Sequence, residues 1–262
     1  MASETESKTH YVLVHGSCHG AWCWYKLKPL LESVGHRVSV VDLAASGIHP
    51  AKIEDLHSFS DYSEPLMKLL AALPAGDEKV VLVGHSYGGM NIALAADIFP
   101  HKIALTVFLA AFLPDTNHRP SYVLEQFQEK TASEARLDSE ICDRGSLKTL
   151  LFGPKFLSSC LYQLCSKEDV ELAKTLMRPS PNFVDNLSKE NNFSQEGFGS
   201  VPRAFITCNQ DLAIPLEFQQ WMIQNSGVNE VLEIKDADHM AMLSTPRELC
   251  DALLQLALKY AE

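Results

Sequence analysis

The stretch KVVLVGHSYGGMNIALAADIF, residues 79–99, decides the fold. The residues before Gly84 form a mostly apolar, β-branched run typical of a buried strand, whereas those from Met90 onward carry apolar side chains at helical spacing. Ser86 stands between the two segments, with Gly84 and Gly88 two residues to either side. A side chain held at a sharp strand-to-helix turn needs unusual backbone angles and small neighbours. We therefore predict that Ser86 lies on a strained turn near a helix N-terminus, where developing negative charge is stabilised.

Length and composition bound the class of protein. A chain of 262 residues suits one large α/β domain or a core with an inserted subdomain. The net charge of −11, with both signs interspersed, argues against nucleic acid and membrane surfaces as partners. The seven cysteines are scattered without metal-ligand spacing, residues 1–10 are polar, and no apolar run approaches transmembrane length. We therefore expect a soluble cytoplasmic protein with reduced cysteines, no metal site and no secretory signal.

Apolar and amphipathic segments alternate along most of the chain. Short, almost continuously hydrophobic runs are typical of parallel strands that are covered on both faces. Strands that alternate with helices imply right-handed crossovers and a doubly wound α/β sheet. The predicted strands are 11–15, 37–42, 79–84, 104–110, 203–208 and 230–234, and the predicted helices are 22–34, 53–73, 90–99, 216–225 and 246–261.

One long stretch interrupts this alternation. From about residue 114 to about residue 200 the sequence shows no convincing strand, only helix-like pieces separated by breaks such as the one around Pro179. An insertion of this length cannot be a structureless loop in a compact domain. We expect residues 114–200 to form a mostly helical cap over the carboxyl ends of the strands, and residues 1–113 and 201–262 to form the core.

A serine hydroxyl is a weak nucleophile until a base takes its proton, and histidine suits that task at neutral pH. Of the ten histidines, His239 is the strongest candidate, because it lies in KDADHMAML between the last strand and the final helix. Its alternative interpretation is an ordinary histidine of a surface loop. We assign His85 a packing role, because adjacent residues on a turn point apart, and His15 a loop-shaping role. The other histidines are placed on polar surfaces or in the N-terminal segment.

The base needs an acid that holds its tautomer and stabilises the imidazolium. Asp211 follows the predicted strand RAFITC in the loop NQDLAIP, again at the carboxyl edge of the sheet; its alternative role is an Asx turn. Asp236 and Asp238 are too close to His239 in sequence to fold back onto its ring. The chain order Ser86, Asp211, His239 is that of the α/β-hydrolase arrangement.

The negative charge that develops on a carbonyl oxygen during acyl transfer needs hydrogen-bond donors, which form an oxyanion hole. The backbone N–H of Tyr87, at the start of the helix, is one candidate. The loop after the first strand, VHGSCHGAW, supplies the second, because Gly16 permits close approach and the N–H of Ser17 faces the pocket. Elements far apart in the chain thus agree on one constellation for nucleophilic catalysis.

These motifs resemble the plant methylesterase and hydroxynitrile lyase family of α/β-hydrolases along essentially the whole chain. The resemblance implies a six-stranded parallel core, a helical cap, no cofactor and frequently a homodimer. It also implies small carboxylic methyl esters as substrates, including those of salicylic, jasmonic and indole-acetic acids and of certain alkaloid intermediates. The motifs that carry it are HYVLVHGSCHGAWCWYKLKPLLES, DLAASG, DYSEPL, VGHSYGGMN, FGPKF, ELAKTLMRPS, EFQQW and ADHMAML.

The sequence also separates the branches of this family. Its hydroxynitrile lyases carry a threonine where this chain has Gly16 and a lysine where it has Met240, and their turn often begins Gly-Glu-Ser rather than Gly-His-Ser. Without a cation at position 240, a departing cyanide ion has no stabilising charge. Its methylketone synthases lose the serine or the acid, and both are present here. We therefore predict a serine carboxylesterase; the alternatives are a hydroxynitrile lyase and a non-catalytic small-molecule receptor of the same fold.

The substrate pocket is expected to be apolar and roofed by the cap. The hydroxyl of Tyr87, where many relatives have an aliphatic residue or phenylalanine, adds a polar contact there. About half of the candidate residues are expected to belong to the ordinary core, as apolar residues at helical spacing usually do. The candidates are Gly16, Ser17, Tyr87, Phe112, Tyr122, Leu151, Phe156, Leu161, Met177, Leu212, Met240 and Met242.

Overall fold

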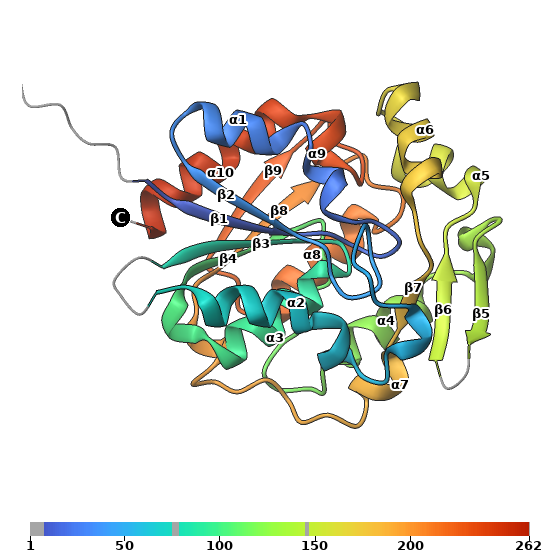
Figure 1. Ribbon diagram of the computed structural model, residues 1–262, viewed down its shortest axis with the longest axis horizontal. Coiled ribbons are helices and arrows are strands. Elements are labelled where there is room, and N and C mark those ends of the chain that lie inside the picture. Colours follow the sequence, from blue (N-terminus) through green and yellow to red (C-terminus); the bar gives the residue numbers. More distant parts are fainter. Residues whose placement is uncertain (1–7, 75–78, 145–146, 262) are drawn as a thin grey trace, which may run out of the picture.

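The central element of the fold is a six-stranded parallel sheet with the strand order β2-β1-β3-β4-β8-β9 (Figure 1). The computed structural model describes residues 8–74, 79–144 and 147–261 of the chain. The six predicted strands are confirmed to within one residue at each end. They are β1 (His10–Val14), β2 (Arg37–Val41), β3 (Val80–His85), β4 (Ile103–Leu109), β8 (Arg203–Cys208) and β9 (Glu230–Ile234).

Helices cover both faces of this sheet, which explains why its strands read as continuous apolar runs. All six residues of β3, at the centre of the sheet, are buried. One face packs against α1 (Leu27–Ser33) and α10 (Pro246–Tyr260). The other face packs against α2 (Phe59–Ala72), α3 (Gly88–Ile98) and α8 (Leu216–Asn225). The protein therefore has one apolar cluster on each side of the sheet, and the predicted doubly wound α/β fold is confirmed (Figure 1).

Two of the predicted helices, 22–34 and 53–73, are each divided in two. The second division has a local cause: the side chain of Ser58 accepts a hydrogen bond from the N–H of Asp61, and the Asp61 carboxylate accepts one from the N–H of Ser58. This capping box starts α2 after Ser58. The short helices of the core are η1 (Ala21–Trp24) before α1, η2 (Ile53–Asp55) before α2, η3 (Pro100–Lys102) before β4 and α9 (Ala241–Ser244) before α10.

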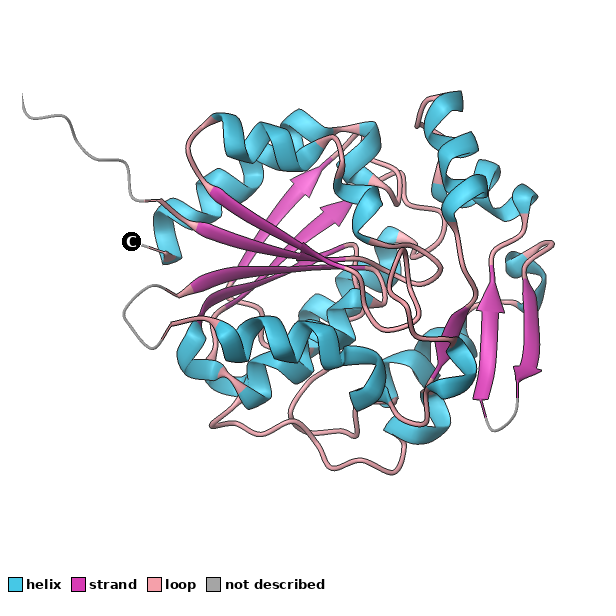
Figure 2. Cartoon of the chain, viewed as in Figure 1, coloured by secondary structure: helices cyan, strands magenta, loops and turns pink. Residues whose placement is uncertain are grey.

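The insertion between β4 and β8 contains strands, so the prediction of a segment without them is wrong. β5 (Glu140–Arg144), β6 (Leu147–Leu151) and β7 (Ser180–Asn182) form an antiparallel sheet at the edge of the molecule (Figure 2). Every residue of β5 is exposed, and β7, although two of its three residues are buried, contains Pro181, so neither has the apolar sequence pattern of a core strand. The helices of this region are α4 (Tyr122–Lys130), η4 (Ser133–Arg136), α5 (Pro154–Phe156), the π-helix η5 (Leu157–Leu161), α6 (Lys167–Leu176), α7 (Val184–Leu187) and η6 (Phe198–Ser200).

The elements from β5 to β7 lie beyond the carboxyl ends of the core strands (Figure 1). The loops that follow β1, β3, β8 and β9 therefore open towards this region, which we call the cap. None of the helices in the described part of the chain is long and apolar enough to cross a membrane. Residues 1–7, which make up most of the polar segment behind the expected absence of a secretory signal, lie outside the described residues.

Candidate active site

The turn between β3 and α3 holds Ser86 in a left-handed backbone conformation, with φ at +54°. A Cβ atom on Gly84 would lie 2.7 Å from the carbonyl oxygen of Gly88, and one on Gly88 would lie 2.6 Å from that of His15. Both positions therefore require glycine. The N–H of Ser86 donates to the carbonyl of Leu109, so the turn is tied to the end of β4. The predicted strained turn is confirmed, and its strain is local to Ser86.

The loops after β8 and β9 bring together the predicted acid and base. Nδ1 of His239 lies 2.7 Å from Oδ2 of Asp211, and both residues are buried. The other carboxylate oxygen of Asp211 accepts hydrogen bonds from the N–H groups of Ala213 and Ile214, each at 2.8 Å, and Gln219 reaches Oδ2 at 3.3 Å. Because an ionised carboxylate only accepts, Nδ1 of His239 carries the proton. Nε2 is left as the acceptor of the ring.

The loop after β1 lies directly against the turn that carries Ser86. A Cβ atom on Gly16 would be 2.7 Å from Cβ of Ser86 and 3.2 Å from its Oγ. Within the described residues, the backbone N–H groups of Ser17 and Tyr87 donate no hydrogen bond. Unpaired N–H groups beside a serine on a strained turn are what an oxyanion hole requires.

His85, the residue before Ser86, packs against His239. Its Nε2 lies 2.8 Å from the carbonyl oxygen of His239, the two rings are 4.6 Å apart, and Trp24 packs edge-on against His85. Because a carbonyl only accepts, Nε2 of His85 carries the proton, while its Nδ1 is buried without a partner. Burial and the neighbouring His239 hold the pKa of His85 well below its ordinary value. The residue is neutral and packs under the base.

Three further histidines are buried: His10 in β1, and His15 and His19 in the loop after β1. His15 accepts the N–H of Leu43 at Nε2 and donates to the carbonyl of Gly16 at Nδ1, so it joins the loops after β1 and β2. His19 is also buried, which corrects its placement on a polar surface. Its ring stacks between Trp22 and Tyr162, and burial lowers the pKa of His19 to about 3. Sequence reasoning missed this residue because nothing in its spacing marks a buried histidine.

The predicted pocket residues are spread over both sides of the sheet. Tyr87 and Phe112 belong to the apolar cluster under α2, and the Tyr87 hydroxyl is buried without a partner. On the other side, the buried or half-buried candidates are Phe156, Leu161, Met177, Met240 and Met242. Leu151 is half-buried at the end of β6, and Tyr122 stacks on His118. Leu212 is 58 % exposed, which is incompatible with an enclosed pocket wall in this conformation, because it follows Asp211 on the outer side of the loop.

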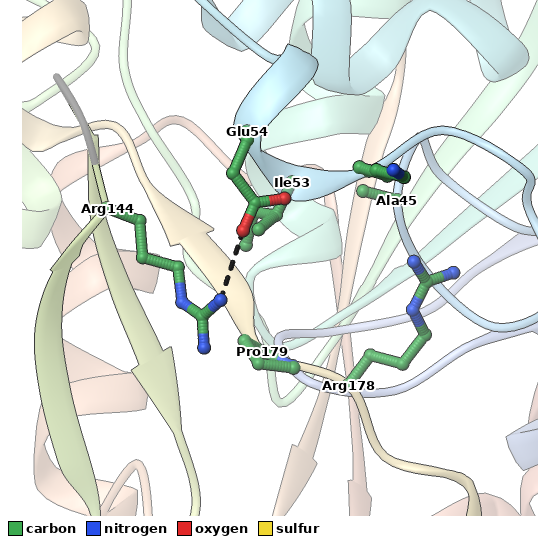
Figure 3. Close-up of a pocket in the computed structure, with 7 residues that line it drawn as sticks. Ala45, Ile53, Glu54, Arg144, Arg178 and Pro179 are labelled. Atoms are coloured by element: carbon green, nitrogen blue, oxygen red, sulfur yellow. Dashed lines mark hydrogen bonds and ion pairs between the residues drawn. The ribbon is translucent and has the colours of Figure 1, made fainter.

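A hollow of about 270 Å³ lies between η2 and the cap and contains none of the predicted site residues (Figure 3). The guanidinium of Arg178 beside it donates to three carbonyl oxygens of the 47–51 loop. Arg144 forms an exposed ion pair with Glu54 at 3.0 Å. Because both arginines are engaged in joining the cap to the core, we assign this hollow no part in the chemistry.

Parallel strands under helices, a serine on a strained turn after the central strand, and an aspartate–histidine pair on the loops of two later strands define an α/β hydrolase. A family model described as the alpha/beta hydrolase family matches residues 11–252. The chain belongs to this family.

The chain is also similar to individual plant proteins over nearly its whole length. It is 56 % identical to salicylic acid-binding protein 2 of Nicotiana tabacum, over 96 % of this chain and 98 % of that protein. It is 55 % identical to methylesterase 1 of Arabidopsis thaliana, over 98 % and 99 % of the two chains. A solved structure of polyneuridine aldehyde esterase matches it with a TM-score of 0.94 at 49 % identity, over 96 % and 100 %. The predicted resemblance to plant methylesterases is confirmed.

Proposed function

We propose that the protein is a serine carboxylesterase that hydrolyses small methyl esters. Ser86 is the nucleophile, His239 the general base and acid, and Asp211 the group that orients His239. The observation that carries the proposal is the buried 2.7 Å hydrogen bond between Asp211 and Nδ1 of His239, on loops that open at the same edge as the Ser86 turn. A base with a fixed tautomer beside a strained serine is the arrangement that activates a hydroxyl group.

The first half of the reaction forms an acyl-enzyme. Oγ of Ser86 attacks the ester carbonyl while Nε2 of His239 takes its proton. The carbonyl oxygen becomes an oxyanion, which accepts hydrogen bonds from the N–H groups of Ser17 and Tyr87. His239 then gives the proton to the methoxy oxygen, so methanol leaves as the C–O bond breaks. The buried Asp211 carboxylate stabilises the imidazolium between these two proton transfers.

The second half of the reaction reverses these roles with water. Nε2 of His239 takes a proton from a water molecule, which attacks the acyl carbonyl, and the same N–H groups hold the second oxyanion. Collapse of that intermediate returns the proton to Oγ of Ser86 and releases the carboxylic acid. No residue outside the constellation is required for either proton transfer.

The names of the relatives support the substrate class. The 55 % identical relative is a methylesterase, and the relative of known structure is a polyneuridine aldehyde esterase. We extend the proposal to a small ester as the sole ligand, with no nucleic acid or membrane partner, and to a homodimer in the cytoplasm. The seven cysteines are all free in the structure, which supports a reducing compartment.

The test is a panel of methyl esters of salicylate, jasmonate, indole-acetate and an alkaloid acid, assayed for methanol release. At least one is expected to be hydrolysed, and Ser86→Ala is expected to lose at least ~10³-fold in kcat. Near-wild-type turnover by Ser86→Ala, or no turnover of any ester by the wild type, would overturn the proposal.

Hydroxynitrile lyase activity is the second candidate to exclude. Met240 is buried and apolar, so it offers a departing cyanide ion no charge, and an unpaired anion in a dry site is costly. We expect negligible cleavage of mandelonitrile and acetone cyanohydrin by the wild type. The variant Gly16→Thr/Met240→Lys is expected to lose esterase activity, because a Cβ atom at position 16 displaces Ser86. Cyanohydrin cleavage by the wild type as fast as its best ester hydrolysis contradicts the esterase assignment.

A receptor without catalysis is the remaining alternative, and the name of one relative, salicylic acid-binding protein 2, suggests salicylate as its ligand. Titration calorimetry of salicylate against wild type and Ser86→Ala separates the two. An enzyme shows product binding together with ester turnover that depends on Ser86. Tight binding with no turnover of the methyl ester assigns the chain to the receptor class.

A further inference from the structure

A single turn of the cap touches three of the loops that carry the proposed chemistry. The turn consists of residues 162–165, between the π-helix η5 and helix α6, and is closed by a hydrogen bond from the N–H of Cys165 to the carbonyl of Tyr162. Its members contact the loops after β1, β8 and β9. We call these residues the 162–165 turn.

The first contact reaches the loop that carries Ser17. The hydroxyl of Tyr162 lies 2.6 Å from Nε2 of His19, and Nδ1 of His19 lies 2.8 Å from the carbonyl oxygen of Ser17. The carbonyl only accepts, so Nδ1 carries the proton and Nε2 accepts from the Tyr162 hydroxyl. The two rings also stack 5.8 Å apart. This buried relay fixes the peptide group that follows the Ser17 N–H.

The next contacts reach the loops of the acid and the base. Nε2 of Gln163 donates to the carbonyl of Gln210, the residue before Asp211, at 2.6 Å. The N–H of Leu164 donates to Oδ2 of Asp238, the residue before His239, at 2.9 Å. The thiol of Cys165 lies 3.4 Å from the same oxygen.

Asp238 also binds its own loop. Its Oδ1 accepts the N–H of Met240 at 3.0 Å, so the carboxylate spans the backbone on both sides of His239 and joins it to the cap. The side chain is fully buried. A buried carboxylate that loses one of its hydrogen bonds lowers the stability of the fold. The Asp238 carboxylate therefore favours the backbone arrangement in which all its hydrogen bonds are made.

The start of α6, which follows the turn, is held to the core by separate contacts. The Asp169 carboxylate accepts hydrogen bonds from the hydroxyl of Tyr25 at 2.5 Å and from Nζ of Lys26 at 2.6 Å, and it also bonds Ser166. These contacts hold the cap to the core without touching a loop that bears a proposed catalytic group. They therefore provide matched controls for the contacts of the turn.

We propose that the 162–165 turn positions the oxyanion loop, the acid loop and the base loop together, and that Tyr162 and Asp238 are positioning residues for ester hydrolysis. This inference rests on the proposed function. Neither residue touches the reacting atoms in this proposal. Tyr162 acts through His19 on the donor of the oxyanion hole, and Asp238 acts through the backbone on His239. Both act through one turn, so their effects are coupled.

The test compares Tyr162→Phe and Asp238→Asn with the controls Tyr25→Phe and Asp97→Asn. The control residues make hydrogen bonds of the same kind: Tyr25 to Asp169, and Asp97 to the backbone of Ser194. Each test variant is expected to lower kcat about tenfold with KM within about twofold, because positioning of the oxyanion donor and the base matters in the transition state. Both controls are expected to keep kcat within about twofold.

Two further measurements separate positioning from mere folding. The affinity for a trifluoromethyl ketone, which forms a tetrahedral adduct with the serine, is expected to fall in Tyr162→Phe by the same factor as kcat/KM, while binding of the product acid is unchanged. The double variant Tyr162→Phe/Asp238→Asn is expected to lose less than the product of the two single losses. Equal losses in Tyr162→Phe and Tyr25→Phe, or a rise in KM with unchanged kcat, would overturn the inference.

The rate at which a fluorophosphonate labels Ser86, followed by mass spectrometry, distinguishes failure of the inference from failure of the proposed function. This rate reports the activated serine whether or not any ester of the panel is a substrate. If Ser86 is labelled but no ester is hydrolysed, the proposed substrate class fails, and slower labelling of Tyr162→Phe still supports the turn. If labelling is as fast in Tyr162→Phe as in the wild type, the inference fails alone. No labelling of the wild type overturns both.

Discussion

The two sheets of the molecule are held in different ways. Every residue of β3 in the six-stranded sheet is buried, whereas every residue of β5 in the cap sheet is exposed. Polar side chains also join this region to the core: Arg144 of β5 pairs with Glu54, and Arg178, just before β7, donates to three carbonyl oxygens of the 47–51 loop. Burial of apolar surface stabilises a fold far more than exposed ion pairs do. We therefore expect the core sheet to supply most of the stability and its loops to carry the catalytic residues. The cap sheet is expected to add little stability.

The largest expected effect is on chemistry at the core. Asp211→Asn keeps the shape of the side chain but offers His239 an amide donor, which favours the tautomer that cannot take the proton of Ser86. We expect kcat for the best methyl ester to fall at least ~10³-fold. Asp143→Asn on β5 and Asp236→Asn, both at exposed positions, are the controls and should leave kcat unchanged. A comparable loss in either control contradicts the assignment of the acid.

The second effect concerns stability and tests the comparison directly. Leu82 in β3 is fully buried, and Leu82→Ala is expected to lower the free energy of unfolding by about 3 kcal/mol, from lost burial and the cavity left behind. Ile141 in β5 is 44 % exposed, so Ile141→Ala is expected to lower it by about 0.5 kcal/mol or less. Urea unfolding of both variants measures this. Equal losses would mean that the cap sheet shares in the stability of the core.

The third effect compares a glycine-to-alanine substitution next to Ser86 with one in the insertion. A Cβ atom at Gly16 meets Cβ of Ser86 at 2.7 Å, and we expect Gly16→Ala to lower kcat/KM about 30-fold by displacing the nucleophile. At Gly199 a Cβ atom meets the end of the flexible Gln195 side chain at 2.6 Å, so Gly199→Ala is expected to have wild-type activity. Steady-state kinetics of the two variants decides the point; an unaffected Gly16→Ala removes the steric argument.

A smaller effect appears in the pH dependence of stability. Burial lowers the pKa of His19 to about 3, whereas the ordinary value is 6.5. Between these values the unfolded chain binds more protons than the folded one, so the free energy of unfolding falls as the pH falls below 6.5. His19 accounts for up to about 1.4 kcal/mol per pH unit of that slope. Urea unfolding between pH 4 and 6 is expected to show a shallower slope in His19→Gln, with data at pH 8 as the reference. An unchanged slope contradicts a neutral buried His19.

The contrast between the two sheets also marks what the sequence allows one to predict. Core strands are buried on both faces, so the six apolar runs identify them to within a residue. β5 carries charged, exposed side chains, and Pro181 in β7 indicates a break, so neither of these two cap strands has an apolar pattern to detect. The division of the predicted helix 53–73 was detectable, because Ser58 and Asp61 form a capping box in the sequence.

The candidate site is likewise predicted from the sequence only where a local pattern encodes it. Ser86, Asp211 and His239 stand at the ends of predicted strands, so the topology of a parallel sheet brings their loops to one edge. The contact of Tyr162 with His19 joins residues 143 positions apart and depends on how the cap folds back. No local pattern encodes such a contact. Sequence reasoning therefore finds the groups that react and misses those that hold them.

The left-handed conformation of Ser86 has a consequence for the history of such a protein. A Cβ atom at φ +54° is strained, and glycine is not, so Ser86→Gly is expected to raise the free energy of unfolding by about 1 kcal/mol. Ser86→Ala keeps the Cβ atom and should not, so the difference between the two variants in thermal unfolding isolates the strain. Selection for catalysis thus acts against the more robust fold at this position. In a relative no longer selected for catalysis, a single Ser86→Gly substitution would therefore raise the stability of the fold while removing the nucleophile.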